Sequence, residues 1–355
     1  MRAWSAVLCA DWSKDPAKRE VYAASVARRR VWRIKPPSGG WNVKTALDSA
    51  SRLRVGRSPV LVGFDAPIGV PASFLKLTGA PTFKQWLWTA KVPSLFQPVS
   101  DPHDWSVRRP FFLVPEGKGS RSGFENHLRR LGVTPKRRID EICKANPVFI
   151  AAGIAGAVGS AAIDLWRGLR GSDSPPPIWP FDGTLADLLN SRAPVVVAEI
   201  YPRLAYSLAG HPARHPERSL VFVSKTQPSA RVRYMENLLS NASWLHHEGV
   251  TVNDHWMALA SEDAFDALVT AAGLLRCLLE RTPLNDQRFE DPIAEGGILG
   301  SGSVCLEMTE RLPAAGAARS MNASGAAGSN KITRGSITRT ANLSRLLNVG
   351  GGRTK

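Results

Sequence analysis

Short apolar runs separated by turn-forming residues open the chain, and they predict three β-strands, a helix and a further strand. Residues 5–11 (SAVLCAD) and 19–27 (REVYAASVA) have the apolar content of strands, and residues 29–35 (RRVWRIK) alternate apolar with basic side chains, as a strand with one exposed face does. Because the spacers between these runs are short, we expect an antiparallel meander. Residues 42–54 carry apolar side chains at helical spacing, ahead of a strand over 59–65. The predicted order is β-β-β-α-β.

The middle of the chain has a different composition. From residue 72 to about 145 it is rich in Pro, Gly, Trp and basic residues, which predicts a loop-rich insertion within about 72–190. Residues 147–163 (PVFIAAGIAGAVGSAAI) are 17 uncharged positions, at the lower limit of the ~17–25 that span a bilayer. Since this run is rich in Ala and Gly rather than Leu, it predicts a buried helix packed closely through Gly153, Gly156 and Gly159, and not a membrane span.

A strand, a helix and a tail are expected after the insertion. Residues 193–199 (APVVVAE) are β-branched and predict a strand. Residues 261–281 place their apolar side chains on one helical face, with Ser261 as the N-cap. Residues 306–355 are rich in small and polar residues and hold eight Lys or Arg against two acids, which predicts a basic, disordered tail.

Acidic residues end three of the apolar runs: Asp11, Asp65 in LVGFDAPIGVP, and Glu199 in APVVVAEIYPR. An ionised carboxylate there is costly to desolvate unless a positive or hydrogen-bonding group receives it. If these strands are parallel neighbours, their carboxylates gather at the carboxyl end of the sheet, where open α/β folds bind ligands. Asp263 and Asp266 are spaced i, i+3 and share a face of the late helix, although acids also favour helix N-termini because of the helix dipole.

A convergence of carboxylates predicts a metal site. Like charges in a partly buried pocket are strongly destabilised unless divalent cations neutralise them, and oxygen ligands in this number suit Mg²⁺ or Mn²⁺. Two such ions ~3.5–4 Å apart activate a water and stabilise the leaving oxygen in phosphodiester cleavage. We therefore expect Asp11, Asp65, Asp263 and Asp266 to be metal ligands, and Glu199 to be a further ligand or to orient the water, which makes all five candidate catalytic residues.

The order of these segments resembles that of the DUF429 family of predicted nucleases with the ribonuclease H-like fold. Asp11, Asp65 in FDAPIGVP, Glu199 in AEIYPR, and Asp263 with Asp266 in EDAFDAL match its acidic positions, and RRIDEICKANPVF, IWPFDG and EGGIL resemble its recurring segments. The resemblance covers roughly residues 5–300. It implies an α/β, ribonuclease H-like domain over residues 1–305, with a mixed five-stranded sheet of three antiparallel strands followed by parallel strands, flanked by helices. The tail lies outside the resemblance.

The charge of the chain indicates a polyanionic partner. The formal net charge is +16 and the pI about 10.2, and such a field attracts nucleic acid or an anionic membrane surface. Lys136, Arg137 and Arg138 form a basic cluster that either contacts a nucleic-acid backbone or is a solvated face. Arg203, four residues after Glu199, either pairs with that carboxylate or meets a phosphate.

The cysteines and the N-terminus favour a cytoplasmic location. The four cysteines are far apart and have no histidines at zinc-ligand spacing, and the first apolar run is too short for a signal peptide.

These features favour a metal-dependent nuclease that uses Mg²⁺ or Mn²⁺ and binds nucleic acid. An alternative is a non-catalytic nucleic-acid-binding protein on the same fold, whose acids are structural hydrogen-bond acceptors. An actin-like-fold ATPase or kinase is a weaker alternative, because such enzymes carry a D-x-G motif on the first strand and the segment DWSKD has no glycine.

Overall fold

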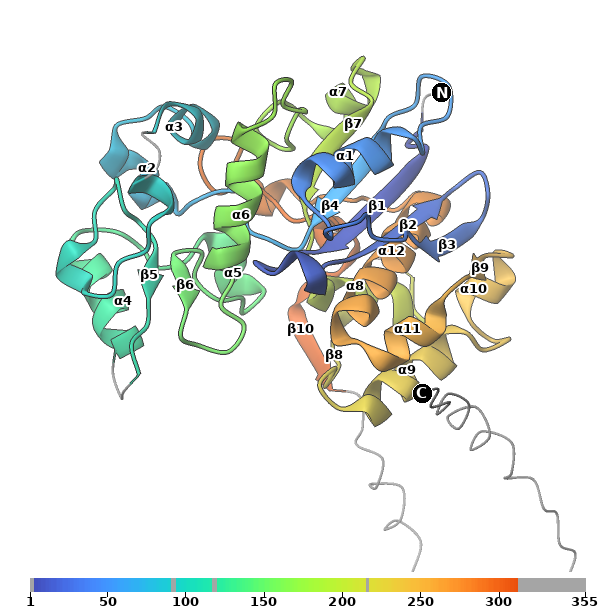
Figure 1. Cartoon of the computed structure of the whole chain (residues 1–355). Helices are drawn as coiled ribbons and strands as arrows, with labels where there is room; N and C mark the ends of the chain where they lie inside the picture. Colours follow the sequence, from blue (N-terminus) through green and yellow to red (C-terminus); the bar gives the residue numbers. More distant parts are fainter. Residues whose placement is uncertain (1–2, 91–93, 117–119, 215–216, 312–355) are drawn as a thin grey trace, which may run out of the picture. The chain divides into compact units, whose positions relative to one another are not determined.

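A mixed six-stranded sheet lies at the centre of the residues that the computed structural model describes, 3–90, 94–116, 120–214 and 217–311 (Figure 1). Its strands are β1 (Ala6–Asp11), β2 (Glu20–Ser25), β3 (Arg30–Arg33), β4 (Val60–Phe64), β7 (Val195–Glu199) and β9 (Thr251–Val252). Their order across the sheet is β7-β4-β1-β2-β3-β9.

The first three strands form the antiparallel meander that the short spacers predict. β1 pairs with β2 and β2 with β3 in antiparallel fashion, whereas β4 joins β1 and β7 joins β4 in parallel. The α/β class and the five expected strands are confirmed. The expected number of strands is wrong by one, because β9 pairs with the free edge of β3. β9 has only two residues, so it does not stand out as an apolar run in the sequence.

Helices cover both faces of the sheet. Alternate residues of a strand face opposite sides, so Leu8 and Val62 belong to one buried cluster while Val7 and Leu61 belong to another. The first face packs against α1 (Val43–Ser51) and α6 (Gly159–Arg170), and the second against α8 (Pro202–Gly210) and α12 (Glu262–Glu280). We call these the α1/α6 layer and the α8/α12 layer.

Capping residues set where the helices begin. Asn42 caps α1 by accepting a hydrogen bond from the backbone N–H of Thr45, and Ser261 caps α12 by accepting one from Ala264. The helices predicted over residues 42–54 and 261–281 are therefore confirmed. α12 is buried at every position from Ala264 to Cys277, because it packs against β1 and β2 on one side and α8 on another.

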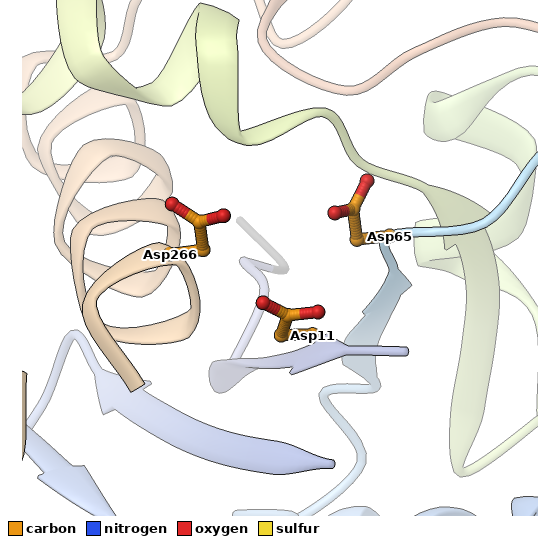
Figure 2. Close-up of side chains that lie close together, drawn as sticks. All are labelled: Asp11, Asp65 and Asp266. Atoms are coloured by element: carbon orange, nitrogen blue, oxygen red, sulfur yellow. The ribbon is translucent and has the colours of Figure 1, made fainter. Parts of the chain in front are cut away.

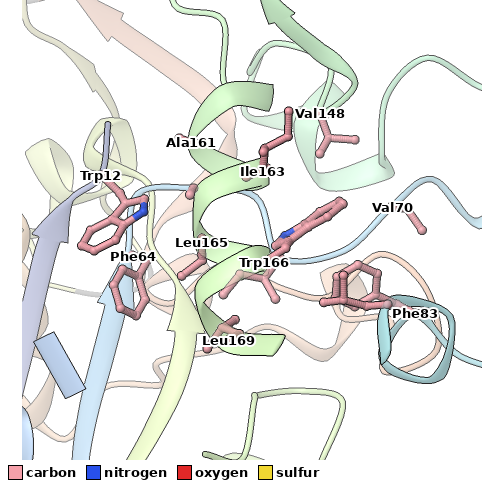
Figure 3. Close-up of a cluster of buried hydrophobic side chains, with 14 of the residues drawn as sticks. Trp12, Phe64, Val70, Phe83, Val148, Ala161, Ile163, Leu165, Trp166 and Leu169 are labelled. Atoms are coloured by element: carbon pink, nitrogen blue, oxygen red, sulfur yellow. The ribbon is translucent and has the colours of Figure 1, made fainter. Parts of the chain in front are cut away.

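The segment between β4 and β7 has more regular structure than the loop-rich insertion that its composition predicts. Its aromatic side chains form a buried cluster around α6, in which the ring centroids of Trp166 and Phe83 are 5.2 Å apart (Figure 3). These aromatic contacts bury a large apolar area, and so they give the segment a core although it contains only short strands. The elements of this segment are α2 (Ala72–Thr78), α3 (Phe83–Thr89), β5 (Phe112–Leu113), α4 (Ser120–Arg130), α5 (Arg138–Ile142), β6 (Ile150–Ala152), α6 and α7 (Leu185–Asn190).

Residues 147–163 do not form the single buried helix that their composition predicts. They contain β6, a turn and the first residues of α6. Gly153 and Gly156 have φ values of +91° and +67°, which favour glycine and interrupt a helix. A Cβ at Gly153 would lie 2.0 Å from the carbonyl oxygen of Val114, so the glycine does permit close packing, but within a turn. Among the described helices, none has the length and apolar character needed to cross a membrane.

The remaining elements follow β7. A second, two-stranded parallel sheet pairs β8 with β10. Because the backbone of β10 is a strand, the expected disordered tail does not begin at residue 306. Residues 312–355 lie outside the described residues, and their disorder stays a prediction. The elements are β8 (Ser219–Phe222), α9 (Pro228–Leu238), α10 (Trp244–His247), α11 (His255–Ala260) and β10 (Cys305–Arg311).

Candidate metal centre

The parallel register of β1 and β4 brings two acidic residues side by side. Ala10 pairs with Phe64, and Asp11 and Asp65 are the next residues along the chain. The backbone N–H of Asp65 donates to the carbonyl oxygen of Ala10 at 2.9 Å, which continues the pairing. Ala10 and Phe64 face the α1/α6 layer, so the side chains that follow them face the α8/α12 layer.

Asp266 joins these two acids from α12. It lies on the helix face that packs against the sheet, and its side chain is 0% exposed. Figure 2 shows the three side chains directed toward one another from the ends of β1 and β4 and from α12. One carboxylate oxygen from each of Asp11, Asp65 and Asp266 lies within 4.8 Å of the other two. Three segments far apart in the sequence thus form one cluster, as the acidic pattern predicts.

Two donors hold the carboxylate of Asp266. The hydroxyl of Tyr206, on α8, donates to Oδ1 at 2.5 Å. The ammonium group of Lys225, which follows β8, forms an ion pair with Oδ2. Both contacts are charge-assisted hydrogen bonds, which are stronger than neutral ones. They orient Asp266 and place a positive charge beside the carboxylate cluster.

Burial and mutual repulsion raise the pKa of each acid in the cluster. Burial raises the pKa of Asp65 to about 8, with the charge of Asp266 as the next cause and Lys225 opposing both. The pKa of Asp11 lies well above its usual value because of burial and then of Asp65 and Asp266. Burial also raises the pKa of Asp266, against the opposing effect of Lys225 and Tyr206. In the absence of a metal the cluster therefore retains protons, which a divalent cation would displace.

The donor set of the cluster fits a hard divalent cation. Anionic oxygens from Asp11, Asp65 and Asp266 are the ligands that Mg²⁺ and Mn²⁺ prefer. Neighbouring and opposite ligands of an octahedral ion bound at ~2.1 Å are about 3–4 Å apart. Oxygens already within 4.8 Å of one another reach that spacing with a small side-chain movement. Oxygen ligands alone do not distinguish between the two metals.

Asp263, the other expected ligand on α12, is not one of the converging acids. It lies one turn before Asp266 and is half-buried. Its charge raises the pKa of Asp11, Asp65 and Asp266, so it is close enough to add to the negative potential of the cluster. Of the two acids on α12, Asp266 lies on the buried face and belongs to the cluster, whereas Asp263 does not.

Glu199 ends β7 but belongs to a different cluster. It pairs with Phe64, not with Asp65, so strand alternation directs its side chain to the opposite face of the sheet. Its carboxylate accepts a hydrogen bond from the backbone N–H of Ile68 at 2.7 Å and one from each terminal nitrogen of Arg137 at 2.7 Å. Glu199 is therefore not among the carboxylates that converge as candidate ligands.

The basic cluster at residues 136–138 divides between core and surface. Arg137 is fully buried, and its guanidinium group binds Asp140 as well as Glu199. This burial leaves Arg137 no surface for a nucleic-acid backbone, so its expected role in substrate binding does not fit the fold. Lys136 is half-buried and Arg138 is exposed.

A pocket of about 380 Å³ opens beside the carboxylate cluster. Arg203 lines it and does not pair with Glu199, whose carboxylate is taken by Arg137. Instead, the guanidinium of Arg203 donates to the carbonyl oxygen of Cys143 at 3.3 Å and lies 5.7 Å from the ring centroid of Phe222. Of the two roles expected for Arg203, its place in the pocket favours contact with an anionic ligand. The acidic, cationic and aromatic groups of the lining include Asp65, Asp266, Arg203, Lys225 and Phe222.

Arg19 contacts the residue that follows Asp11 and two residues of neighbouring segments. Its guanidinium carbon lies 4.1 Å from the ring centroid of Trp12, and one of its nitrogens is 2.8 Å from Asp164 on α6. Another nitrogen donates to the carbonyl oxygen of Trp41 at 2.6 Å. These contacts tie the end of β1 to the α1/α6 layer, which holds the backbone of Asp11 in place.

The sequence reasoning missed Lys225 and Tyr206. Lys225 comes three residues after a short strand of a separate sheet, and nothing near it in the sequence marks it as the partner of an acid 41 residues later. Tyr206 carries a weak signal, because a tyrosine hydroxyl on the apolar face of α8 needs a polar partner. Their convergence on Asp266 depends on tertiary packing.

The fold and this cluster define an α/β protein with a carboxylate triad that can hold a divalent ion. Comparisons with protein-family models, curated proteins and solved structures found no match.

Proposed function

We propose that the chain is a divalent-metal-dependent nuclease with a ribonuclease H-like core. The observation that carries this proposal is the convergence of Asp11, Asp65 and Asp266 at the carboxyl ends of two parallel strands. The antiparallel β1-β2-β3 unit, continued by parallel β4 and β7, supports the ribonuclease H-like topology and the resemblance to DUF429.

The residues of the site divide into metal ligands and phosphate contacts. Asp11, Asp65 and Asp266 would hold Mg²⁺ or Mn²⁺, which supplies Lewis-acid stabilisation of the phosphate and activation of a water. Arg203 and Lys225 line the adjoining pocket, where their charges attract the phosphodiester. The net charge of +16 favours approach of a polyanion. Glu199 and Arg137 support the end of β7 from the other face and take no part in the chemistry.

The test is a panel of labelled single-stranded, double-stranded and branched DNA and RNA, incubated with Mg²⁺ or Mn²⁺. Asp11→Asn and Asp65→Asn each remove one anionic ligand and are expected to lower cleavage by about 100-fold or more, since a metal ion contributes several kcal/mol to the transition state. Asp48→Asn is the matched control, because Asp48 is 52% exposed on α1 and pairs only with Lys44 among the ion pairs of the described residues.

Near-ultraviolet circular dichroism checks that each variant is folded. Cleavage that persists in both Asp11→Asn and Asp65→Asn would contradict the nuclease proposal. Salt-sensitive binding of the panel without cleavage in the wild type would favour the alternative, a nucleic-acid-binding protein. One observation favours this alternative: the ion pair of Lys225 with Asp266 already neutralises part of the cluster without a metal ion.

A further inference from the structure

Lys225 is the cation that the acids of the cluster share. Its ammonium group pairs with Asp266, and its positive charge also acts on Asp11, Asp65 and Asp263. Lys225 is the cation among the largest influences on the pKa of both Asp11 and Asp65, and it lowers both values. Lys225 therefore contributes to the charge balance of the whole cluster.

The charge balance of the cluster fits one divalent ion. Three converging carboxylates and one ammonium group leave two uncompensated negative charges, which a single divalent cation neutralises. Before a substrate binds, two divalent cations would make the site net positive, even when the half-buried Asp263 is counted with the other acids. Excess charge of either sign is costly in a partly buried site.

We propose that Lys225 replaces the second metal ion: the cluster binds a single divalent ion, and the ammonium group of Lys225 supplies the second positive charge at the scissile phosphate. This inference rests on the proposed nuclease function. It differs from the two-ion site that the acidic pattern predicts.

The position of Lys225 lets it serve both the cluster and the substrate. Its side chain is 37% exposed, whereas that of Asp266 is fully buried. Lys225 and Arg203 line the same pocket, so a phosphate that enters it meets both cations. Because a lysine has a flexible stem, the ammonium of Lys225 would be able to contact a phosphate in this pocket if a divalent ion were held by Asp11, Asp65 and Asp266.

A structural ion pair and a second cation of the site predict different results when the charge is removed. A structural role predicts that loss of Lys225 lowers stability and activity together. The proposed role predicts that metal affinity rises while the cleavage rate falls. Loss of the ammonium makes the potential at the metal site more negative, and it also removes a cation from the phosphate. Tighter metal binding combined with slower cleavage is therefore the diagnostic result.

The experiment titrates the metal-free full chain with Mn²⁺ by isothermal titration calorimetry and measures cleavage separately. Wild type is expected to bind one ion per chain. Lys225→Met is expected to bind Mn²⁺ at least about tenfold more tightly or to bind a second ion, because a repelling charge next to the site is lost. At saturating Mn²⁺ its cleavage of the best substrate of the panel is expected to fall by about 100-fold or more.

Two further variants complete the design. Lys84→Met removes another half-exposed lysine that is paired with an aspartate, Asp182, and should match wild type in both assays. Lys225→Arg keeps the positive charge and should keep the single-ion stoichiometry. If Lys225→Met does not fold, the stoichiometries of wild type and Lys225→Arg still test the proposal.

The outcomes separate this inference from the nuclease function. The proposed role of Lys225 would be overturned if wild type bound two Mn²⁺ ions. It would also be overturned if folded Lys225→Met had the same Mn²⁺ affinity and stoichiometry as wild type. Neither result would contradict metal-dependent cleavage. Wild type that binds no Mn²⁺ would overturn both proposals. One-ion binding without cleavage of any substrate would overturn the nuclease and the phosphate contact, and would support Lys225 only as the counter-ion of the cluster.

Discussion

Two cationic side chains face the pocket beside the carboxylates, and their contacts differ. Lys225 is paired with Asp266, whereas Arg203 donates to a backbone carbonyl and lies against the ring of Phe222. A guanidinium has more N–H donors than the one that binds Cys143, and such donors suit phosphate oxygens, although the Nε of Arg203 is itself buried. The two residues are therefore expected to affect different steps, Lys225 the metal and the scissile phosphate, and Arg203 the binding of the nucleic-acid backbone.

Arg203→Ala is expected to weaken nucleic-acid binding without changing the affinity for Mn²⁺. Loss of one phosphate contact lowers the slope of log K against log salt by about one. Fluorescence anisotropy of a labelled oligonucleotide at several salt concentrations measures this slope. Arg28→Ala, which removes an exposed arginine from the turn between β2 and β3, is the control. Equal effects of the two substitutions would mean that Arg203 contributes only to the overall charge.

Among the secondary-structure elements, strand register decides which acids can act together. Ala10 pairs with Phe64 and Phe64 pairs with Glu199, so Glu199 is one position short of Asp11 and Asp65 and faces the other side of the sheet. The apolar runs predict that each strand ends in an acid. They do not predict the register, because it is fixed by contacts between strands that are far apart in the sequence.

The same distinction holds for the helices. Ser261 as an N-cap and the apolar periodicity after it predict α12, and the burial of Asp266 follows from its place on the packed face. The periodicity could not predict that Lys225 would reach Asp266, since the two residues belong to separate elements. Residues 147–163 show the opposite failure, because their uncharged composition predicts a helix, whereas Gly153 and Gly156 have positive φ and make a turn.

The buried ion network between α5 and β7 is expected to be essential for stability. Arg137→Met would leave Glu199 and Asp140 buried without the guanidinium that binds both. Breaking a buried ion pair from one side typically costs about 3–5 kcal/mol, and urea denaturation of the metal-free protein measures it. Arg138→Met replaces the exposed neighbour of Arg137, and its free energy of unfolding should stay within about 0.5 kcal/mol of the wild-type value. A similar, small decrease in the free energy of unfolding of Arg137→Met and Arg138→Met would show that Glu199 and Asp140 find other partners.

For the whole molecule, the carboxylate cluster should couple stability to pH. The folded protein holds the pKa of Asp65 at about 8, above the value of about 3.9 that an aspartate has in an unfolded chain. Between these two pH values the folded state keeps a proton that the unfolded state has released, so the free energy of unfolding falls as pH rises. The loss is absent below about pH 4 and complete above about pH 8. Burial raises the pKa of Asp11 and Asp266 as well, which gives their contributions the same sign.

Thermal unfolding of metal-free wild type and Asp65→Asn between pH 5 and pH 9, with and without Mg²⁺ or Mn²⁺, tests this coupling. Without metal, the variant should gain stability relative to wild type as pH rises, because it has no proton to lose at this position. With metal, wild type should regain the stability that it loses as pH rises. The increase in its melting temperature on adding metal should grow up to about pH 8, because a cation binds the deprotonated carboxylates and must displace their protons at lower pH. Asp65→Asn should show little of this gain. A metal-induced stabilisation that is independent of pH, or equal in the two proteins, would mean that the cation binds elsewhere and that the three aspartates are held together by Lys225 and protons alone.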